Sequence, residues 1–284
     1  MAITRIGIVV KQGSYEAMAL SGDIAESLVQ KNVDVYGDVE LAKRVDGMKG
    51  IDRQDMPNVV DCIIVLGGDG TMLYTARLVA GRKVPILGVN MGSLGFMTSI
   101  KVEEVFANLD KVLKGDFELE ERMMLSVNIG GASKSISYSV LNDVVIKSTM
   151  ARLCNLETKV DGDLVNNYRC DGLILATPTG STGYSLSAQG PILYPTIHSI
   201  ILVPICPFNL TNRPIVVADT MEVEVTVGKG NESVQISLDG QIDMPLNEGS
   251  IITVKRAEKS VFLIKCEGKS YFDILRERLL WEIK

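Results

Sequence analysis

The first half of the chain alternates short apolar runs with longer amphipathic stretches. Apolar runs rich in Val and Ile predict buried strands, and apolar residues at helical spacing predict helices. The predicted strands are 5–10, 33–36, 62–66 and 84–89, and the predicted helices are 17–31, 73–80 and 102–113. This order indicates an α/β domain with a Rossmann-like parallel sheet. Residues 37–58 are polar and mixed, and they are not assigned to any element.

Near residue 117 the pattern changes to short strands separated by turns. The predicted strands are 124–129, 135–141, 153–160, 164–168, 173–175, 221–227, 234–238, 251–254 and 261–266. Hairpin spacing of this kind indicates a mainly antiparallel β-sandwich. An amphipathic helix is predicted at 271–283. The sequence therefore predicts an α/β domain of residues 1–117 and 268–284 and a β-rich domain of residues 118–267.

Composition and charge narrow the class of protein. The 284 residues are 46% hydrophobic and 23% charged, as in a soluble chain with an ample core. A formal net charge of −6 gives no general attraction to nucleic acid or to an anionic membrane. The longest apolar run, at 200–205, is too short to span a bilayer, and the amino end shows no signal peptide. We therefore expect a cytoplasmic protein that binds neither nucleic acid nor membrane.

The cysteines are odd in number, form no Cys-x-x-Cys pair and lie in apolar or strand contexts. This pattern predicts buried free thiols in a reducing compartment. The five residues are Cys62, Cys154, Cys170, Cys206 and Cys266.

A single acidic residue stands among glycines where the strand 62–66 ends. The run Gly67-Gly68-Asp69-Gly70-Thr71 precedes a predicted helix, and open α/β sheets bind ligands at such strand ends. Glycines let backbone N–H groups approach a phosphate. Asp69 could hold Mg²⁺, bind ribose hydroxyls or take a proton from a hydroxyl, or it could simply cap the helix. The only histidine, His198, has no partner motif, so acid–base chemistry is left to a carboxylate.

Other polar segments also follow predicted strands. A second glycine loop, 90–97, comes after the strand 84–89, and the strand 173–175 leads into a loop dense in hydroxyls and glycine that extends to Pro191. Hydroxyls and free N–H groups together can cradle a polyphosphate, although a serine-rich surface loop has the same composition. Asn142-Asp143 and Asp239-Gly240-Gln241 are each most simply explained as turns.

Together these segments resemble the NAD kinases, which phosphorylate the adenosine ribose 2′-hydroxyl of NAD. The run Gly-Gly-Asp-Gly is shared with phosphofructokinases and diacylglycerol-type lipid kinases, whereas the long run 171–187 is specific to the family. The matching segments are 67–71, 90–96, 142–143, 171–191, 206–207, 212–214 and 239–241.

The resemblance implies a role for each matching residue. Asp69 corresponds to the general base that activates the 2′-hydroxyl, and Asn142 with Asp143 corresponds to the pair that binds the adenosine end. The other implied dinucleotide-binding residues are Gly70, Arg152, Arg169, Asp171, Thr179, Thr182, Gly183, Tyr184, Ser185, Leu186, Ser187 and Gln241. The family often has His after Cys-Pro, but here Phe208 occupies that position, so any role of that histidine is absent.

The resemblance also implies substrates and assembly. NAD and ATP are the implied substrates, with Mg²⁺ accompanying ATP and no protein cage of metal ligands. The family forms homo-oligomers whose subunits share sites, which predicts a homodimer or homotetramer. Two alternatives remain open. A lipid kinase would share the Asp69 loop but should expose an apolar or basic membrane face. A dinucleotide sensor would keep the loop 171–191 and could dispense with Asp69.

Overall fold

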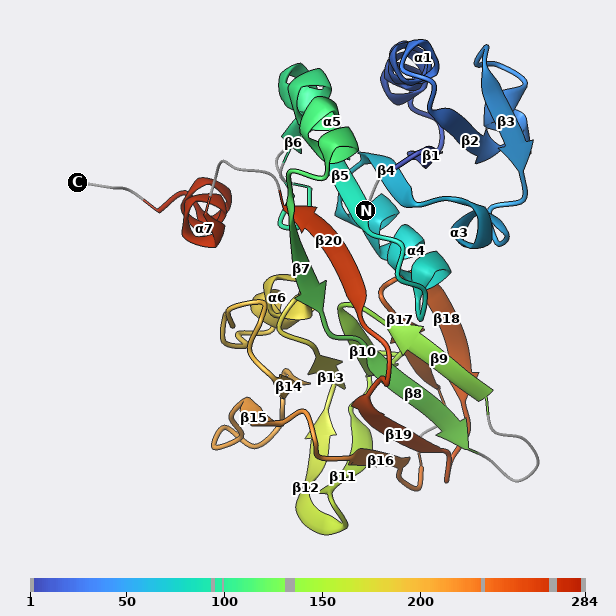
Figure 1. The fold of residues 1–284 in the computed structure, drawn as a ribbon. Helices are drawn as coiled ribbons and strands as arrows, with labels where there is room; N and C mark the ends of the chain where they lie inside the picture. The colour runs from blue at the N-terminus through green and yellow to red at the C-terminus, as the bar shows by residue number, and fades with distance from the viewer. Residues whose placement is uncertain are drawn as a thin grey trace. The chain divides into compact units, whose positions relative to one another are not determined.

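The computed structural model describes residues 3–92, 95–98, 100–130, 136–230, 233–265 and 270–281. The chain forms two compact units (Figure 1). Unit 1 consists of Met1–Glu121 and Val261–Lys284, and unit 2 consists of Arg122–Ser260.

Unit 1 is an α/β unit built on a mostly parallel sheet. Its strands are β1 (Arg5–Val10), β2 (Asp34–Asp38), β3 (Met48–Ile51), β4 (Cys62–Gly67), β5 (Ile86–Asn90), β6 (Ile100–Lys101), β7 (Glu118–Arg122) and β20 (Val261–Lys265). Its α-helices are α1 (Tyr15–Gln30), α2 (Val39–Ala42), α3 (Met56–Val59), α4 (Asp69–Val79), α5 (Val105–Lys114) and α7 (Tyr271–Leu279). Within the described residues the sheet order is β3-β2-β1-β4-β5-β20-β7, with β6 paired to β5.

Local sequence explains why these elements form. All six residues of β4 are buried, as expected for a central parallel strand covered on both faces. In α1 the side chain of Ser14 accepts a hydrogen bond from the Ala17 N–H at the helix start. The helix α5 ends at Gly115, whose φ of 77° is left-handed and favours glycine. The α/β prediction for this half is confirmed.

Two features of unit 1 differ from the expectation. The unassigned residues 37–58 contain α2, β3 and the first three residues of α3. Each of these elements is four residues long and therefore too short to show a period. The strand predicted at 261–266 does not join the β-rich half. Instead β20 pairs in parallel with β5, with Leu263 opposite Ile86. A short apolar strand does not reveal its sheet, because its pairing partner lies far away in the sequence.

Unit 2 is a sandwich of two antiparallel sheets. Its strands are β8 (Leu125–Gly130), β9 (Ile136–Val140), β10 (Asp143–Ser148), β11 (Cys154–Val160), β12 (Asp163–Cys170), β13 (Gly172–Ala176), β14 (Ser199–Ile205), β15 (Ile215–Ala218), β16 (Val223–Val227), β17 (Val234–Leu238), β18 (Ile242–Leu246) and β19 (Ile251–Arg256). A 3₁₀ turn (Gly180–Thr182) and the short helix α6 (Tyr184–Ser187) follow β13. The sheet orders are β15-β14-β13-β10-β17-β18 and β12-β11-β16-β19-β8-β9.

Alternating side chains build the core between these two sheets. Buried and partly exposed residues alternate along β16, so one face of the strand packs inward. The shared core includes Val144 of β10, Leu175 of β13 and Val225 of β16. The opposite face of β13 and β14 packs against Ala188 and Leu193, which lie beyond α6. The β-sandwich prediction is confirmed.

Of the four described cysteines, three follow the prediction and one does not. Cys62, Cys154 and Cys170 are buried and free, whereas Cys206 is free but exposed. The predicted burial of Cys206 is wrong because β14 ends one residue earlier, at Ile205, and the chain turns there with a φ of 44° at Cys206. Cys266 lies outside the described residues. No described helix is long and apolar enough to cross a membrane.

Candidate functional site

The side chain of Asp69 is held in place by the second glycine loop. Asp69 is the first residue of α4, directly after β4 and the cap residue Gly68. Its carboxylate accepts hydrogen bonds from two backbone N–H groups, Phe96 to Oδ2 at 2.9 Å and Met97 to Oδ1 at 3.1 Å. Two donors on two oxygens fix the plane of the carboxylate, while each oxygen keeps a lone pair for another donor.

This close approach requires glycine in the second loop. A Cβ at Gly95 would stand 2.9 Å from Asp69 Cγ and 2.5 Å from the Thr98 hydroxyl. Real Cβ contacts are not that short, so any other residue at Gly95 would displace the carboxylate or the loop. Gly70 is exposed beside Asp69. Residues 93 and 94 of the same loop lie outside the described residues.

Unit 1 contains a cavity of about 610 Å³ at the carboxyl ends of β1, β2 and β3, which we call the carboxyl-end cavity. Its lining includes three basic side chains and the ring of Tyr74. Sequence analysis missed this cavity because most of its residues fall in 37–58, which showed no period. The lining residues are Val10, Lys11, Gln12, Gly13, Ser14, Met18, Asp38, Val39, Glu40, Leu41, Arg44, Ile51, Asp52, Arg53, Gln54 and Tyr74.

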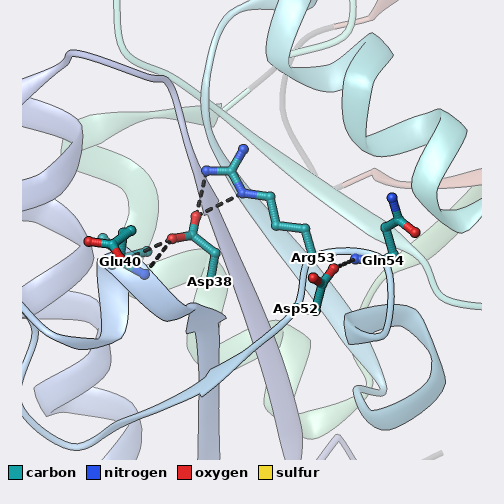
Figure 2. A network of polar contacts seen from close by, with 6 residues as sticks. Asp38, Glu40, Asp52, Arg53 and Gln54 are labelled. Carbon is teal, nitrogen blue, oxygen red and sulfur yellow. Dashed lines mark hydrogen bonds and ion pairs between the residues drawn. The ribbon is translucent and has the colours of Figure 1, made fainter.

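An ion pair organises one side of this cavity (Figure 2). Arg53 donates to Asp38 Oδ2 from Nε at 2.8 Å and from Nη2 at 2.5 Å. The other oxygen of Asp38 caps α2 by accepting from the Glu40 and Leu41 N–H groups. Burial alone would raise the pKa of Asp38, but the Leu41 N–H and the Arg53 guanidinium outweigh it and lower that pKa. The Arg53 guanidinium also lies 5.7 Å from the centre of the Tyr74 ring.

In unit 2 the hydroxyl-rich loop packs directly against Asn142 and Asp143. Thr177 donates from Oγ1 to the Leu141 carbonyl at 2.6 Å, and its N–H donates to the Asn142 carbonyl at 2.9 Å. Thr177 Oγ1 also accepts from the Gly180 N–H at 3.0 Å. A Cβ on Gly183 would stand 3.4 Å from Asp143 Oδ2. The structure therefore brings the predicted pair and the predicted loop together.

Asp143 is buried next to a second carboxylate. It is 5% exposed. Burial and the charge of Asp239 raise the pKa of Asp143 to about 7, although the backbone N–H of Tyr184 acts in the opposite direction. A carboxyl with this pKa changes its protonation state near neutral pH. A titration in this range is typical of functional sites.

The remaining loop residues lie on or beside α6. Thr179 is buried and accepts a hydrogen bond from Arg122 Nη1 at 3.3 Å. Thr182 donates to the Thr179 carbonyl at 3.2 Å. Ser185 is buried, and its hydroxyl has no hydrogen-bond partner in the part of the chain that the structure describes. Tyr184 and Ser187 are exposed, Leu186 is half-buried, and Gln241 is exposed at the turn after β17.

The structure does not gather all predicted dinucleotide-binding residues at one place. Asp143 begins β10 and is paired with Ala176, whereas Asp171 lies at the other end of these strands, where its carbonyl accepts from the Ser148 N–H. Arg152 follows the same far end of β10, beyond Ser148. Six residues of strand separate the two ends by roughly 17 Å. We call Arg152, Arg169 and Asp171 the far cluster.

Phe208 contacts Arg169 of the far cluster. The Arg169 guanidinium lies 4.9 Å from the centre of the Phe208 ring, and the Phe208 N–H donates to the Arg169 carbonyl at 2.8 Å. Phe208 is 67% exposed. The aromatic ring thus supports the arginine by a cation–π contact, which a neutral imidazole could also make but an imidazolium could not.

Comparisons with known proteins place the chain among phosphotransferases. A family model described as ATP-NAD kinase N-terminal domain matches residues 6–117, and one described as ATP-NAD kinase C-terminal domain matches residues 141–266. A curated NAD kinase from Geotalea daltonii is 43% identical over 279 residues, and one from Syntrophotalea carbinolica is 44% identical over 280 residues. Each of these comparisons covers 98% of both chains.

Two solved structures are also similar. The chain resembles a yeast NADH kinase complexed with NADH, with a TM-score of 0.90 at 24% identity over 99% of this chain and 88% of that chain. At that identity the likeness concerns the fold. An NAD kinase from Archaeoglobus fulgidus in complex with ATP gives a TM-score of 0.77 at 28% identity, over 96% of this chain and 99% of that chain.

Proposed function

We propose, because the chain belongs to the NAD kinase family, that this enzyme transfers the terminal phosphoryl group of ATP to the 2′-hydroxyl of the adenosine ribose of NAD, giving NADP. The observation that carries the proposal is the Asp69 carboxylate, held by two backbone N–H groups at a strand end. A ribose hydroxyl is a poor nucleophile, so it needs a base and a well-placed donor.

Asp69 is the base in this proposal. The hydrogen bonds from Phe96 and Met97 orient the carboxylate, and its remaining lone pairs can accept the hydroxyl proton. The described part of the chain offers no better candidate, because the only histidine, His198, is engaged with Asp219 at 3.1 Å. Asp69 thus removes the proton while other groups hold the phosphates.

We assign the phosphoryl donor to the carboxyl-end cavity. Its volume of about 610 Å³ suits a nucleotide-sized ligand. Lys11, Arg44 and Arg53 offer positive charge to a polyphosphate, and Tyr74 offers a ring face. The A. fulgidus NAD kinase in complex with ATP supports ATP as the donor.

A divalent metal ion would accompany the donor. When bound, Mg²⁺ neutralises the charge of the transferring phosphoryl group. Such an ion is held mainly by phosphates and water and needs only one or two carboxylates. Three carboxylates, Asp38, Glu40 and Asp52, line the carboxyl-end cavity. Arg53 already engages Asp38, and Lys43 engages Glu40 at 2.7 Å. Asp52 is therefore the side chain that fits a contact to the ion. Among the described residues no group of three or more His, Cys, Asp or Glu could hold a metal.

One assay tests the proposed function. Purified protein is incubated with NAD, ATP and Mg²⁺, and product is read with an NADP-specific dehydrogenase. Formation of NADP supports the proposal. Phosphorylation of diacylglycerol in vesicles without NADP formation would favour the lipid kinase alternative instead. NAD binding without turnover would favour the dinucleotide sensor.

Arg53→Gln is expected to raise the Michaelis constant for ATP by about 10–100-fold, because hydrogen bonds to charged groups contribute roughly 1.5–3 kcal/mol. The Michaelis constant for NAD should change little. Steady-state kinetics with each substrate varied in turn measures both. Arg5→Gln is the matched control, since Arg5 forms a similar ion pair with Asp61 at the amino end of β1. Equal effects of the two variants on ATP would refute the donor assignment.

Asp143→Ala is expected to raise the Michaelis constant for NAD by about tenfold or more, because a ligand N–H or O–H then loses its buried acceptor. The constant for ATP should rise much less. The control is Asp163→Ala, an exposed carboxylate at the start of β12. Similar increases for both substrates, or no increase for NAD, would contradict binding of the adenosine end by Asp143.

The split between Asp143 and the far cluster favours a homo-oligomer. If both groups bind one dinucleotide, a second copy of the chain must supply the far cluster. Asp143→Ala and Asp171→Ala chains, each weakly active alone, should then complement each other when co-expressed. Random pairing into dimers predicts roughly a quarter of the wild-type activity. A lack of recovery, or a stable active monomer in light scattering, would show that each chain works alone.

A further inference from the structure

Asp239 is a buried carboxylate in a turn that ordinarily lies at the surface. It is the first residue of the three-residue connection between β17 and β18, with φ of 51°, followed by Gly240 with φ of 62°. The Gln241 N–H closes this turn on the Leu238 carbonyl at 3.0 Å. Positive φ at both positions is typical of a type I′ hairpin turn, where Asp-Gly is common. Asp239 is unusual in being only 6% exposed.

The carboxylate of Asp239 accepts hydrogen bonds from three successive backbone N–H groups. Its Oδ2 accepts from Leu141 at 3.1 Å, and its Oδ1 accepts from Asn142 at 2.7 Å and from Asp143 at 3.2 Å. The Asp239 N–H in turn donates to the Asp143 carbonyl at 3.0 Å. Three converging amides form an anion-binding concavity, and here the bound anion is a side chain from almost 100 residues away.

This arrangement fixes the residues that are assigned to the adenosine end. Asn142 Oδ1 is buried and has no hydrogen-bond partner among the described residues. The direction of the Asn142 side chain is therefore set by its backbone, which Asp239 and Thr177 hold from two sides. Thr177 uses backbone and hydroxyl groups without charge, whereas Asp239 brings a full negative charge close to Asp143.

We propose that Asp239 is a positioning residue of the dinucleotide site, which fixes the backbone of residues 141–143 and, by its charge, sets the pH range in which Asp143 accepts hydrogen bonds from the ligand. This inference rests on the proposed function of Asn142 and Asp143. Asp239 acts through residues 141–143 and itself touches no substrate.

The negative charge of Asp239 affects the protonation of Asp143. A like charge favours the protonated form of Asp143 and so contributes to its pKa of about 7. Burial of Asp143 acts in the same direction, and the Tyr184 N–H on α6 opposes both. As the pH falls below about 7, Asp143 becomes protonated and loses acceptor capacity. The Michaelis constant for NAD should therefore rise on the acid side.

Removal of the Asp239 charge moves this titration. In Asp239→Asn the like charge is gone, so the pKa of Asp143 falls. The rise in the Michaelis constant for NAD on the acid side therefore shifts to lower pH, by about one pH unit. At pH 8 the same variant should raise the NAD constant about tenfold, because one amide oxygen replaces two carboxylate oxygens on the backbone N–H groups. Turnover at saturating NAD and the constant for ATP should stay within a few-fold.

A matched control exists in the same unit. Asp161-Gly162 forms a turn with φ of 49° and 86° between β11 and β12, and Asp161 accepts from the Glu222 N–H at 2.9 Å. Asp161→Asn thus makes the same chemical change in the same type of turn, away from residues 141–143. It should leave the NAD constant and its pH profile unchanged.

The experiment compares full-length wild type, Asp239→Asn, Asp239→Glu and Asp161→Asn from pH 5.5 to 9, with steady-state kinetics and NAD calorimetry. Asp239→Glu keeps the charge but moves it by one methylene, so it should raise the NAD constant without shifting the pH midpoint. This variant also carries the test if Asp239→Asn does not fold. The proposal would be overturned if the pH midpoint of the Michaelis constant for NAD were unchanged in Asp239→Asn. It would also be overturned if this variant raised the Michaelis constants for NAD and ATP equally. Inactive wild-type protein would instead refute the proposed function.

Discussion

Replacing Asp69 by asparagine is expected to depress turnover by a factor of about 10²–10⁴, the usual contribution of a general base. Asparagine keeps the shape of the side chain, and its carbonyl oxygen can still accept one of the N–H hydrogen bonds from Phe96 and Met97. It cannot take a proton from the ribose hydroxyl. NAD affinity should therefore change little while the chemical step slows.

Single-turnover kinetics and NAD calorimetry on the same Asp69→Asn preparation separate three outcomes. A slow chemical step with unchanged binding supports the general base. Loss of NAD binding would make Asp69 mainly a ribose ligand, and survival of both would make it a turn residue. The control is Asp23→Asn, an exposed carboxylate within α1, which should behave as wild type.

Replacing Gly180 by alanine is expected to damage the dinucleotide site through the backbone. A Cβ at Gly180 would stand 2.5 Å from the carbonyl carbon of Asn142 and 2.8 Å from its Cα. Backbone atoms cannot rotate away as a flexible side chain can, so the loop and Asn142 must separate. Forced overpacking of this kind costs about 1–3 kcal/mol of stability. We also expect the Michaelis constant for NAD to rise by at least tenfold.

Thermal unfolding and steady-state kinetics measure the two effects of Gly180→Ala. Gly130→Ala is the matched control in unit 2, because a Cβ there would meet the Ile251 carbonyl at an ordinary 3.5 Å. If Gly180→Ala kept the wild-type melting temperature and the wild-type Michaelis constant for NAD, the separation of the loop from Asn142 would affect neither stability nor NAD binding, and the prediction would be wrong.

The raised pKa of Asp143 also makes the stability of the folded protein depend on pH below neutrality. A pKa of about 7 in place of 3.8 means that the folded protein binds more protons than the unfolded chain between these values. Stability contributed by this group is therefore greatest at low pH and falls as the pH rises toward 7. Ionised Asp143 thus lowers the stability of the fold near pH 7, as expected for a buried group that serves ligand binding.

The sequence by itself determined the two fold classes and most strand positions. Apolar runs in the first half and alternation in the second are local signals, and each reports burial directly. The place of Asp69 was likewise fixed locally, since a glycine turn after a buried strand must lie at the sheet's carboxyl edge. The loop after β13 was recognised for the same reason.

Only the tertiary structure decided which distant groups meet. The sequence gives no sign that β20 joins the sheet of β5, or that Arg53 reaches Asp38 across a segment without periodicity. It does not show that Asp69 is bound by amides 27 and 28 residues later, or that Asp239 accepts a hydrogen bond from the Asn142 N–H. These contacts are hydrogen bonds between residues far apart in the chain. No local sequence pattern predicts these contacts, because only folding of the whole chain brings their donors and acceptors together.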